Sequence, residues 1–216
     1  MFFTHFHWDH IQGVPFFIPI FHPSWHLHFH SVHEPEVLEN YLMGQMRAPY
    51  FPVSMPAALS VRSYVSVPER GVQLGDLRIV RFLLNHPNGA HGYRIEAPGR
   101  SVVFAFDHEH GDDEIDRGII EHAAGADLLI YDAQYTQEEY EARRGWGHST
   151  WQQAARIAKT AGAKQLVLIH HDPMHDDDMV TGIVEQAREQ FANTVGAKEG
   201  WSVTLGATDE EMLEGR

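Results

Sequence analysis

A short segment near the start of the sequence constrains this chain more than any other feature. Residues 4–10 read THFHWDH, so His5, His7, Asp9 and His10 fall within six residues of one another. In an extended segment His5 and His7 share a face, because side chains alternate with period two, and both can therefore reach one metal ion. Asp9 and His10 follow one turn later and can serve a second ion. The alternative, a solvated loop that happens to be rich in histidine, does not account for this spacing.

The composition supports a metal site and limits its chemistry. The 216 residues include 17 histidines and no cysteine. Imidazole is the commonest protein ligand for metals, whereas disulfides and thiolate sites are excluded. With 43% hydrophobic residues, the chain can bury a sizeable core, and we expect a single domain over residues 1–216.

Apolar β-branched runs alternate with helical patterns along the chain, which favours an α/β layered fold. The predicted strands are 60–67, 77–84, 91–96, 101–106, 127–131, 165–169 and 201–205. The predicted helices are 35–46, 113–124, 136–143, 149–161 and 177–192. The stretch 14–33 is rich in Pro, Phe and His, and we expect a loop there, over one face of the domain. Substrate contact by its histidines is the alternative role.

Three possible ligands follow predicted strands. His86 ends the run IVRFLLNH, Asp107 ends SVVFAFD and His170 ends KQLVLIH. A strand end provides rigid backbone that can fix the position of a ligand. A single histidine at a strand end is more often structural, but three such residues in order behind the first motif favour a metal site. His171 is the alternative to His170, and His108, Glu109 and His110 are expected to orient the ligands.

With these residues the chain resembles the metallo-β-lactamase superfamily, whose first metal motif is His-x-His-x-Asp-His. The resemblance implies a four-layer αββα sandwich with a dinuclear site at the edge between two sheets. The implied ligands are His5, His7 and His86 for one metal, and Asp9, His10 and His170 for the other, with Asp107 bridging them. Nitrogen-rich ligation suits two Zn²⁺ ions, with iron or manganese as alternatives. Members usually carry several strands before the first motif, so we expect a fold that lacks them or a partner subunit that supplies them.

A branch of the superfamily is also indicated. Asp132 in LLIYDAQ, the segment Gly147–Thr150 and the run LVLIHHDP resemble the branch that contains tRNase Z and phosphodiesterases acting on small cyclic phosphates. The resemblance implies catalytic roles for Asp9, His148 and Asp132, with Asp132 orienting His148. A carboxylate beside an imidazole favours its protonated form, which can protonate a leaving alcohol. The alternative for His148 is a residue beside a helix N-cap with no catalytic role.

The expected function is therefore a metal-dependent hydrolase, a phosphodiesterase that uses a metal-bridging hydroxide on a small phosphodiester or cyclic phosphate. A carboxyl-ester, lactone or β-lactam hydrolase is the first alternative. A non-catalytic or diiron redox module is the second. The retained His148 segment favours the phosphodiesterase.

The expected partners follow from charge and hydropathy. The formal net charge of −14 argues against a nucleic-acid ligand and for a small-molecule substrate, because phosphate backbones are bound mainly by Lys and Arg. No run of 18 apolar residues occurs, so we expect no membrane span and a cytoplasmic protein. An exposed sheet edge invites pairing. We expect a homo-oligomer that covers Phe2, Phe3, Phe16, Phe17 and Ile18.

Overall fold

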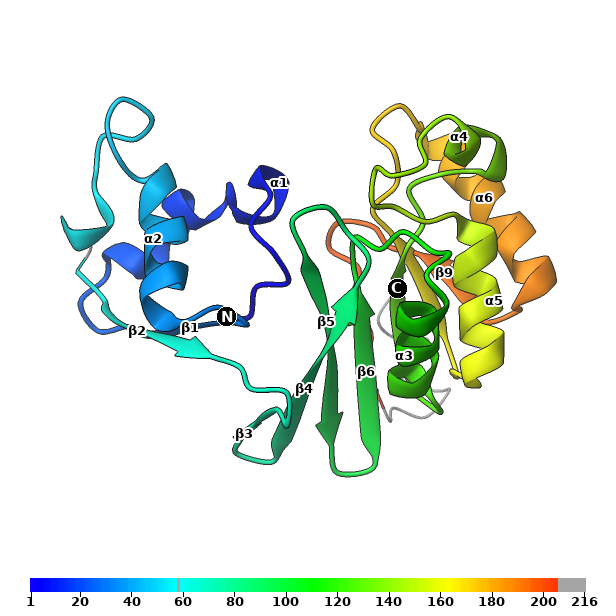
Figure 1. Ribbon diagram of the computed structural model, residues 1–216, viewed down its shortest axis with the longest axis horizontal. Helices are drawn as coiled ribbons and strands as arrows, with labels where there is room; N and C mark the ends of the chain where they lie inside the picture. The colour runs from blue at the N-terminus through cyan, green and yellow to red at the C-terminus, as the bar shows by residue number, and fades with distance from the viewer. Residues whose placement is uncertain (58, 206–216) are drawn as a thin grey trace. The chain divides into compact units, whose positions relative to one another are not determined.

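A computed structural model describes residues 1–57 and 59–205 of the chain. The chain divides into two compact units, Met1–Glu69 and Arg70–Arg216 (Figure 1). Each has its own cluster of buried apolar side chains.

The first unit contains a small sheet and one long helix. The single-turn helix α1 (Trp8–Ile11) leads into two 3₁₀ turns, Val14–Phe16 and Ile18–Phe21, each with a proline near its start. Strand β1 (His26–Ser31) pairs in parallel with β2 (Val61–Ser66), and helix α2 (Pro35–Gln45) connects them, followed by a 3₁₀ turn at Met55–Ala57. The core of this unit lies around α2 and β1, and consists of Phe3, Ile11, Val14, Ile20, Phe29, Leu38, Leu42, Met46 and Met55.

The loop predicted over residues 14–33 is only partly correct. The prolines and aromatic residues up to Phe21 form 3₁₀ turns, but His26–Ser31 is the strand β1. The hydropathy pattern did not predict this strand, because three of its six residues are histidines. The buried Phe29 and the six-residue parallel pairing with β2 supply the stabilisation that the composition did not reveal.

The second unit is built on a seven-stranded sheet whose strands lie in chain order. Strands β3 (Val72–Leu74), β4 (Leu77–Leu84), β5 (Ala90–Ala97) and β6 (Arg100–Ala105) form an antiparallel meander. From β6 onward, β7 (Leu128–Asp132), β8 (Leu166–Ile169) and β9 (Thr194–Gly196) pair in parallel. The strand predicted at 201–205 is absent from the described residues of that segment, and β9 takes the last position in the sheet instead.

Helices connect the parallel strands, as such crossovers require. They are α3 (Asp113–Ala123), α4 (Gln137–Glu141), α5 (Trp151–Ala161) and α6 (Asp177–Gln190), and α3, α5 and α6 lie side by side against the sheet (Figure 1). Helix α5 turns its alanine-rich face and Ile157 into the core. Thr150 caps α5 by accepting the Gln153 amide, and Asp176 caps α6. Among the described residues, no helix combines the length and the apolar composition needed to cross a bilayer.

Candidate metal centre and acid dyad

Four strands of the second unit deliver site residues to one edge of the sheet. Strands β6, β7 and β8 run parallel, and β4 has the same direction as β6 because both are antiparallel to β5. Their carboxyl ends therefore share an edge, where open α/β sheets commonly bind ligands. His86 follows β4, Asp107 follows β6, and His170 follows β8, while Asp132 is the last residue of β7.

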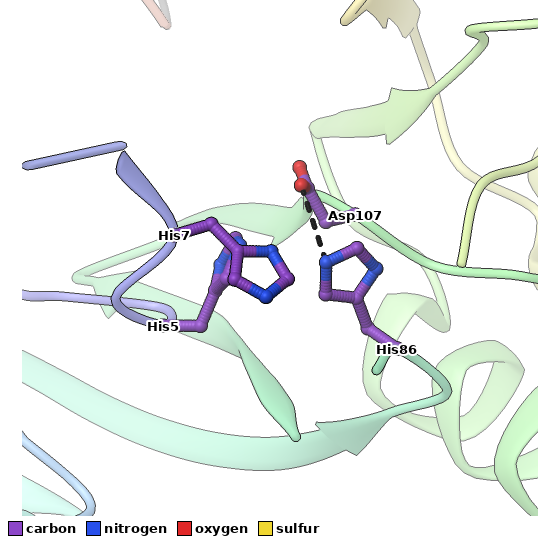
Figure 2. Close-up of side chains that lie close together, drawn as sticks. All are labelled: His5, His7, His86 and Asp107. Carbon is purple, nitrogen blue, oxygen red and sulfur yellow. Dashed lines mark ion pairs between the residues drawn. The ribbon is translucent and has the colours of Figure 1, made fainter. Parts of the chain in front are cut away.

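Asp107 lies between two histidines at this edge. Its Oδ2 is 3.7 Å from His86 Nε2, and its Oδ1 is 3.5 Å from His170 Nε2. Figure 2 shows the first of these pairs as a dashed line. The carboxylate is buried, and Asp107 has a positive φ of 47°. Left-handed backbone in a residue other than glycine is costly and tends to occur at functional sites, which is consistent with a carboxylate held in place for its two neighbours.

His86 is oriented by the loop between α4 and α5. Its Nδ1 lies 2.7 Å from the carbonyl oxygen of Gly147 and must donate a proton to it, which leaves Nε2 directed at Asp107. Gly147 is in turn fixed by Glu109, whose carboxylate accepts the Gly145 and Gly147 amides at 2.7 and 2.8 Å. Tyr140 Oη also donates to Glu109, at 3.0 Å. Glu109 thus orients His86 through the backbone of the loop.

His170 is oriented in the same way by Gln134. The His170 Nδ1 lies 3.1 Å from Gln134 Oε1, so the ring donates there and turns Nε2 to Asp107. His170 also has a positive φ, 59°. The carbonyl of Gln134 accepts the Asp172 amide, which closes the loop after β8. The sequence analysis did not identify Gln134 as a residue that orients His170. Its position two residues after Asp132, just past the end of β7, is the one sequence feature that could have indicated this role.

Asp132 and His148 form a hydrogen-bonded pair. The His148 Nδ1 donates to Asp132 Oδ2 at 2.8 Å. Asp132 is fully buried and accepts three backbone amides as well, those of His108, Gln134 and Ser149. Such a carboxylate is rigidly placed and can hold one tautomer of its partner. The His148 ring stacks on His170 with centroids 4.9 Å apart and meets His86 edge-on at 5.1 Å.

The donor set in the second unit fits a divalent metal. Ligand atoms of Asp107, Asp132, His148 and His170 lie within 4.8 Å of one another. In His86 and His170 the Nδ1 atom donates a hydrogen bond. If the ring is neutral, Nε2 then has no proton, and its lone pair faces an oxygen of the Asp107 carboxylate. Two such acceptors repel each other unless a cation, a proton or a metal ion, lies between them. Imidazole nitrogen with carboxylate oxygen is a donor set typical of zinc and similar ions.

The first motif brings three imidazoles together in the first unit. The His5 ring is 4.6 Å from that of His7 and 4.2 Å from that of His10. Asp9 Oδ2 lies 3.3 Å from His10 Nε2. Figure 2 shows His5 and His7 on the segment before α1. Apart from a bridge between Phe2 and His30, the segment expected to be extended is not part of a strand, and the turn after it is helix α1.

The histidines beside Asp107 differ in role. His108 is fully buried, accepts the Asn85 amide at Nδ1 and donates from Nε2 to Asp116 at 2.9 Å. Burial opposes the ionisation of Asp116, but the hydrogen bonds from His108 and the Gly111 amide outweigh it and hold the pKa of Asp116 below its ordinary value. His110 contacts Ser149 Oγ, and burial lowers its pKa. His108 therefore supports the loop, whereas Glu109 reaches a predicted ligand through Gly147.

His171 lies in a different environment from His170. Neither of its ring nitrogens has a hydrogen-bond partner among the described residues. Burial, together with the neighbouring His175, lowers the pKa of His171. The structure thus directs His170, rather than His171, at Asp107.

Two relatives match this chain over very different shares of its length. Ribonuclease Z of Brevibacillus brevis is 36% identical over 123 residues, which are 55% of this chain and 36% of the relative. Ribonuclease Z of Ignicoccus hospitalis is 25% identical over 246 residues, covering 95% of this chain and 80% of the relative. The chain thus spans about a third of the first relative and most of the second.

Solved structures share the fold. The metallo-β-lactamase fold protein YhfI from Bacillus subtilis has a TM-score of 0.70 at 22% identity, over 93% of this chain and 74% of that one. A diphosphatase from the PhnP family has a TM-score of 0.65 at 19% identity, over 94% and 70% of the two chains. These likenesses confirm the predicted fold class. The family model described as a beta-lactamase superfamily domain matches residues 1–171, and the chain therefore belongs to the metallo-β-lactamase superfamily.

Proposed function

We propose that the chain is a dinuclear metal-dependent hydrolase that cleaves a small phosphodiester. The observation that carries the proposal is the Asp132–His148 pair, with a hydrogen bond of 2.8 Å, beside the Asp107–His170 pair. Metal ligands alone fit several hydrolytic reactions. An imidazole fixed by a buried carboxylate next to them adds a group that can protonate a leaving oxygen.

The proposed ligands are those that the family motif assigns. His5, His7 and His86 would hold one ion, Asp9, His10 and His170 the other, and Asp107 both. Asp9 is also proposed to take part in catalysis, and zinc is the proposed metal. When bound, such ions would provide Lewis acidity and a nucleophile from water at neutral pH.

The chain's own residues then have defined tasks. Asp132 holds His148 by its Nδ1, so the Nε2 of His148 is the atom that can carry the proton to the leaving alkoxide. The three backbone amides on Asp132 keep that carboxylate from rotating. Gln134 and Gly147 hold His170 and His86 by their Nδ1 atoms. In each of these three imidazoles Nδ1 is held by a hydrogen bond, and Nε2 remains for the metal or for proton transfer.

The proposed substrate is small rather than an RNA. Relatives of this chain, including those from Brevibacillus brevis and Ignicoccus hospitalis, are named Ribonuclease Z, so RNA cleavage is the second possible function. The chain has 30 acidic residues against 16 basic ones, and affinity for a phosphate backbone depends mainly on the basic ones. A small phosphodiester needs no such surface.

A substrate panel tests the proposal. Purified protein supplied with Zn²⁺ would be assayed with chromogenic phosphodiesters, an aryl lactone, a β-lactam and a structured RNA. We expect turnover of the phosphodiesters and its loss in His148→Ala. Faster turnover of the lactone or β-lactam, unaffected by His148→Ala, would favour the ester or lactam hydrolase. Cleavage of the RNA alone would favour the ribonuclease.

We also propose that the protein forms a homo-oligomer in the cytoplasm. Phe16 and Ile18 are 74% and 78% exposed, whereas Phe3 is buried and Phe2 and Phe17 are half-buried. Burying a large apolar side chain contributes roughly 1.5–3 kcal/mol, so association over Phe16 and Ile18 would be favourable. Light scattering at micromolar concentration tests this, and a stable monomer would contradict it.

A further inference from the structure

A cavity of about 470 Å³ lies in the first unit, beside the helix that carries the first motif. It is lined by Trp8, Ile11, Tyr41, Gly44, Gln45 and Tyr50. None of these residues is charged, and three are aromatic. Its volume is within the range of small-molecule sites, about 300–1,000 Å³. The lining therefore suits a flat, uncharged ring rather than a phosphate.

Helix α1 connects this cavity to the metal motif. Trp8 and Ile11 line the cavity, and they are separated by one helical turn, which places them on one side of the helix. Asp9 and His10 lie between them in the sequence. Trp8 stands between His7 and Asp9, with neighbouring Cα atoms about 3.8 Å apart. A ring that stacks on Trp8 in the cavity would therefore contact a residue that lies inside the first motif.

The aromatic walls offer stacking surfaces. Trp8 is 57% exposed and Tyr50 74% exposed, so a large part of each residue is accessible to a ligand. Tyr41 is fixed by ring contacts with Phe6 and His33, at 4.9 and 5.2 Å between centroids. Nucleobases stack on such side chains, whatever their sequence, because every base has a π-face.

Gln45 adds an independent sign of a ligand. It lines the cavity and is only 5% exposed, yet neither its amide oxygen nor its amide nitrogen has a hydrogen-bond partner among the described residues. A buried, unpaired amide destabilises a protein. It offers one acceptor and two donors, which matches the mixed donor and acceptor edge of a nucleobase. An aliphatic ligand would leave both groups without a partner.

We propose that this cavity binds the nucleobase of the substrate, which makes the substrate a nucleoside phosphodiester such as a nucleoside cyclic phosphate. This inference rests on the proposed function for the phosphodiester part, but the base subsite can be tested separately. Trp8 and Tyr50 stack on the base, and the Gln45 amide reads its edge.

Binding of adenosine, which has no phosphate, tests the subsite. Calorimetry on the protein as purified would compare wild type with Trp8→Ala, Gln45→Leu and Trp25→Ala. Trp25 is 49% exposed in the same unit and does not line the cavity, so it is the matched control. We expect Trp8→Ala to weaken adenosine binding about tenfold or more, Gln45→Leu to weaken it about fivefold, and Trp25→Ala to leave it unchanged.

A stability measurement on Gln45→Leu supports the same test. Replacing an unpaired buried amide by an apolar group of similar shape is nearly neutral or stabilising, so the variant should unfold at the same or a higher denaturant concentration. Weaker adenosine binding in a variant that is no less stable cannot be attributed to misfolding. Absence of adenosine binding to the wild type, or equal effects of Trp8→Ala and Trp25→Ala, would overturn the proposal.

Turnover separates this inference from the proposed function. The rates on adenosine 2′,3′-cyclic phosphate and on ribose 2′,3′-cyclic phosphate would be compared in wild type and Trp8→Ala. We expect a larger loss of kcat/KM on the adenosine compound. Adenosine binding without any phosphodiester turnover would leave the subsite standing and refute the phosphodiesterase. If both compounds are turned over, Trp8→Ala slows them equally and adenosine does not bind, the phosphodiesterase would stand and the base subsite would be refuted.

Discussion

The carboxylate of Glu109 accepts the backbone amide of Gly147 at 2.8 Å. Glu109 also accepts the Gly145 amide and the Tyr140 hydroxyl, so one side chain closes the loop that precedes His148. The carbonyl of Gly147 holds the Nδ1 of His86. Glu109, two positions after Asp107, thus orients His86, which follows a different strand.

Glu109→Gln should therefore weaken both the fold and the metal site. An amide in place of the carboxylate directs a donor at one of its present donors, which costs about 1–3 kcal/mol of stability. Loss of such an orienting contact typically lowers metal affinity 10–100-fold. Denaturant titration and zinc competition with a chelator measure the two effects. Glu114→Gln, on the exposed surface of α3, is the control and should change neither.

Gly147→Ala should be more damaging than the same change at Gly145. Gly147 and Gly145 have positive φ angles of 89° and 84°. A Cβ at either position is therefore destabilising, because side chains disfavour this backbone conformation. At Gly147 the Cβ would lie 2.2 Å from His86 Nδ1, whereas at Gly145 it would meet nothing within 4 Å. We expect Gly147→Ala to lose about 1–3 kcal/mol more than Gly145→Ala, as measured by denaturation. Equal losses would mean that the loop moves away from His86 without cost.

The strand-end positions of the proposed ligands were predictable from the sequence, because each residue follows an apolar run that is long enough to be recognised. The predicted strand 77–84 is β4. The predicted strand 101–106 is shifted by one residue from β6, and the predicted strand 165–169 begins one residue before β8. The positive φ at Asp107 and His170 was not predictable, because Asp and His adopt left-handed backbone more often than most residues but still only rarely. It follows from the turn that each must make at the sheet edge.

The acid role of His148 can be tested by the choice of leaving group. A poor leaving group needs a proton, so His148→Ala should slow alkyl phosphodiesters by about 10²–10⁴-fold and aryl phosphodiesters much less. Asp132→Asn should follow the same pattern more weakly, because the imidazole stays in place, and should also lose stability, because Asp132 accepts the backbone amides of His108, Gln134 and Ser149. Metal content should be unchanged in both variants. Equal losses on both substrate types, or loss of metal from His148→Ala, would refute the acid role.

Acid should destabilise the protein partly through His30. Burial, the nearby N-terminal amino group and His28 lower the pKa of His30 from 6.5 to about 4. The unfolded chain therefore binds more protons at this residue between pH 4 and 6.5, so its contribution favours unfolding as the pH falls through that window. Above pH 6.5 the contribution vanishes because His30 is neutral in both states.

His30→Phe isolates this effect. The ring stacks on Phe2 at 4.4 Å, and phenylalanine keeps that contact without a titrating group. The unfolding free energy of the variant should fall less steeply than that of the wild type between pH 6.5 and 4, in denaturant titrations at several pH values. Parallel curves would show that His30 is not responsible.

Three other features could not be predicted from the sequence, namely strand β1, the cap of α5 and the role of Gln45, each for a physical reason. Strand β1 alternates histidine with apolar residues and is stabilised by a partner more than 30 positions away. Thr150 caps α5, although the neighbouring Ser149 is an equally suitable capping residue by type. Gln45 is unremarkable in the sequence, and only its burial and its unpaired amide single it out.

Metal stoichiometry tests the central claim most directly. Elemental analysis of the purified protein, before and after reconstitution with Zn²⁺, should give close to two ions per chain. Asp107→Ala should lose both ions together, because the carboxylate directs one oxygen at His86 and the other at His170. Two ions in the wild type and a joint loss in Asp107→Ala are the predicted result. No bound metal, and none taken up on reconstitution, would contradict the account.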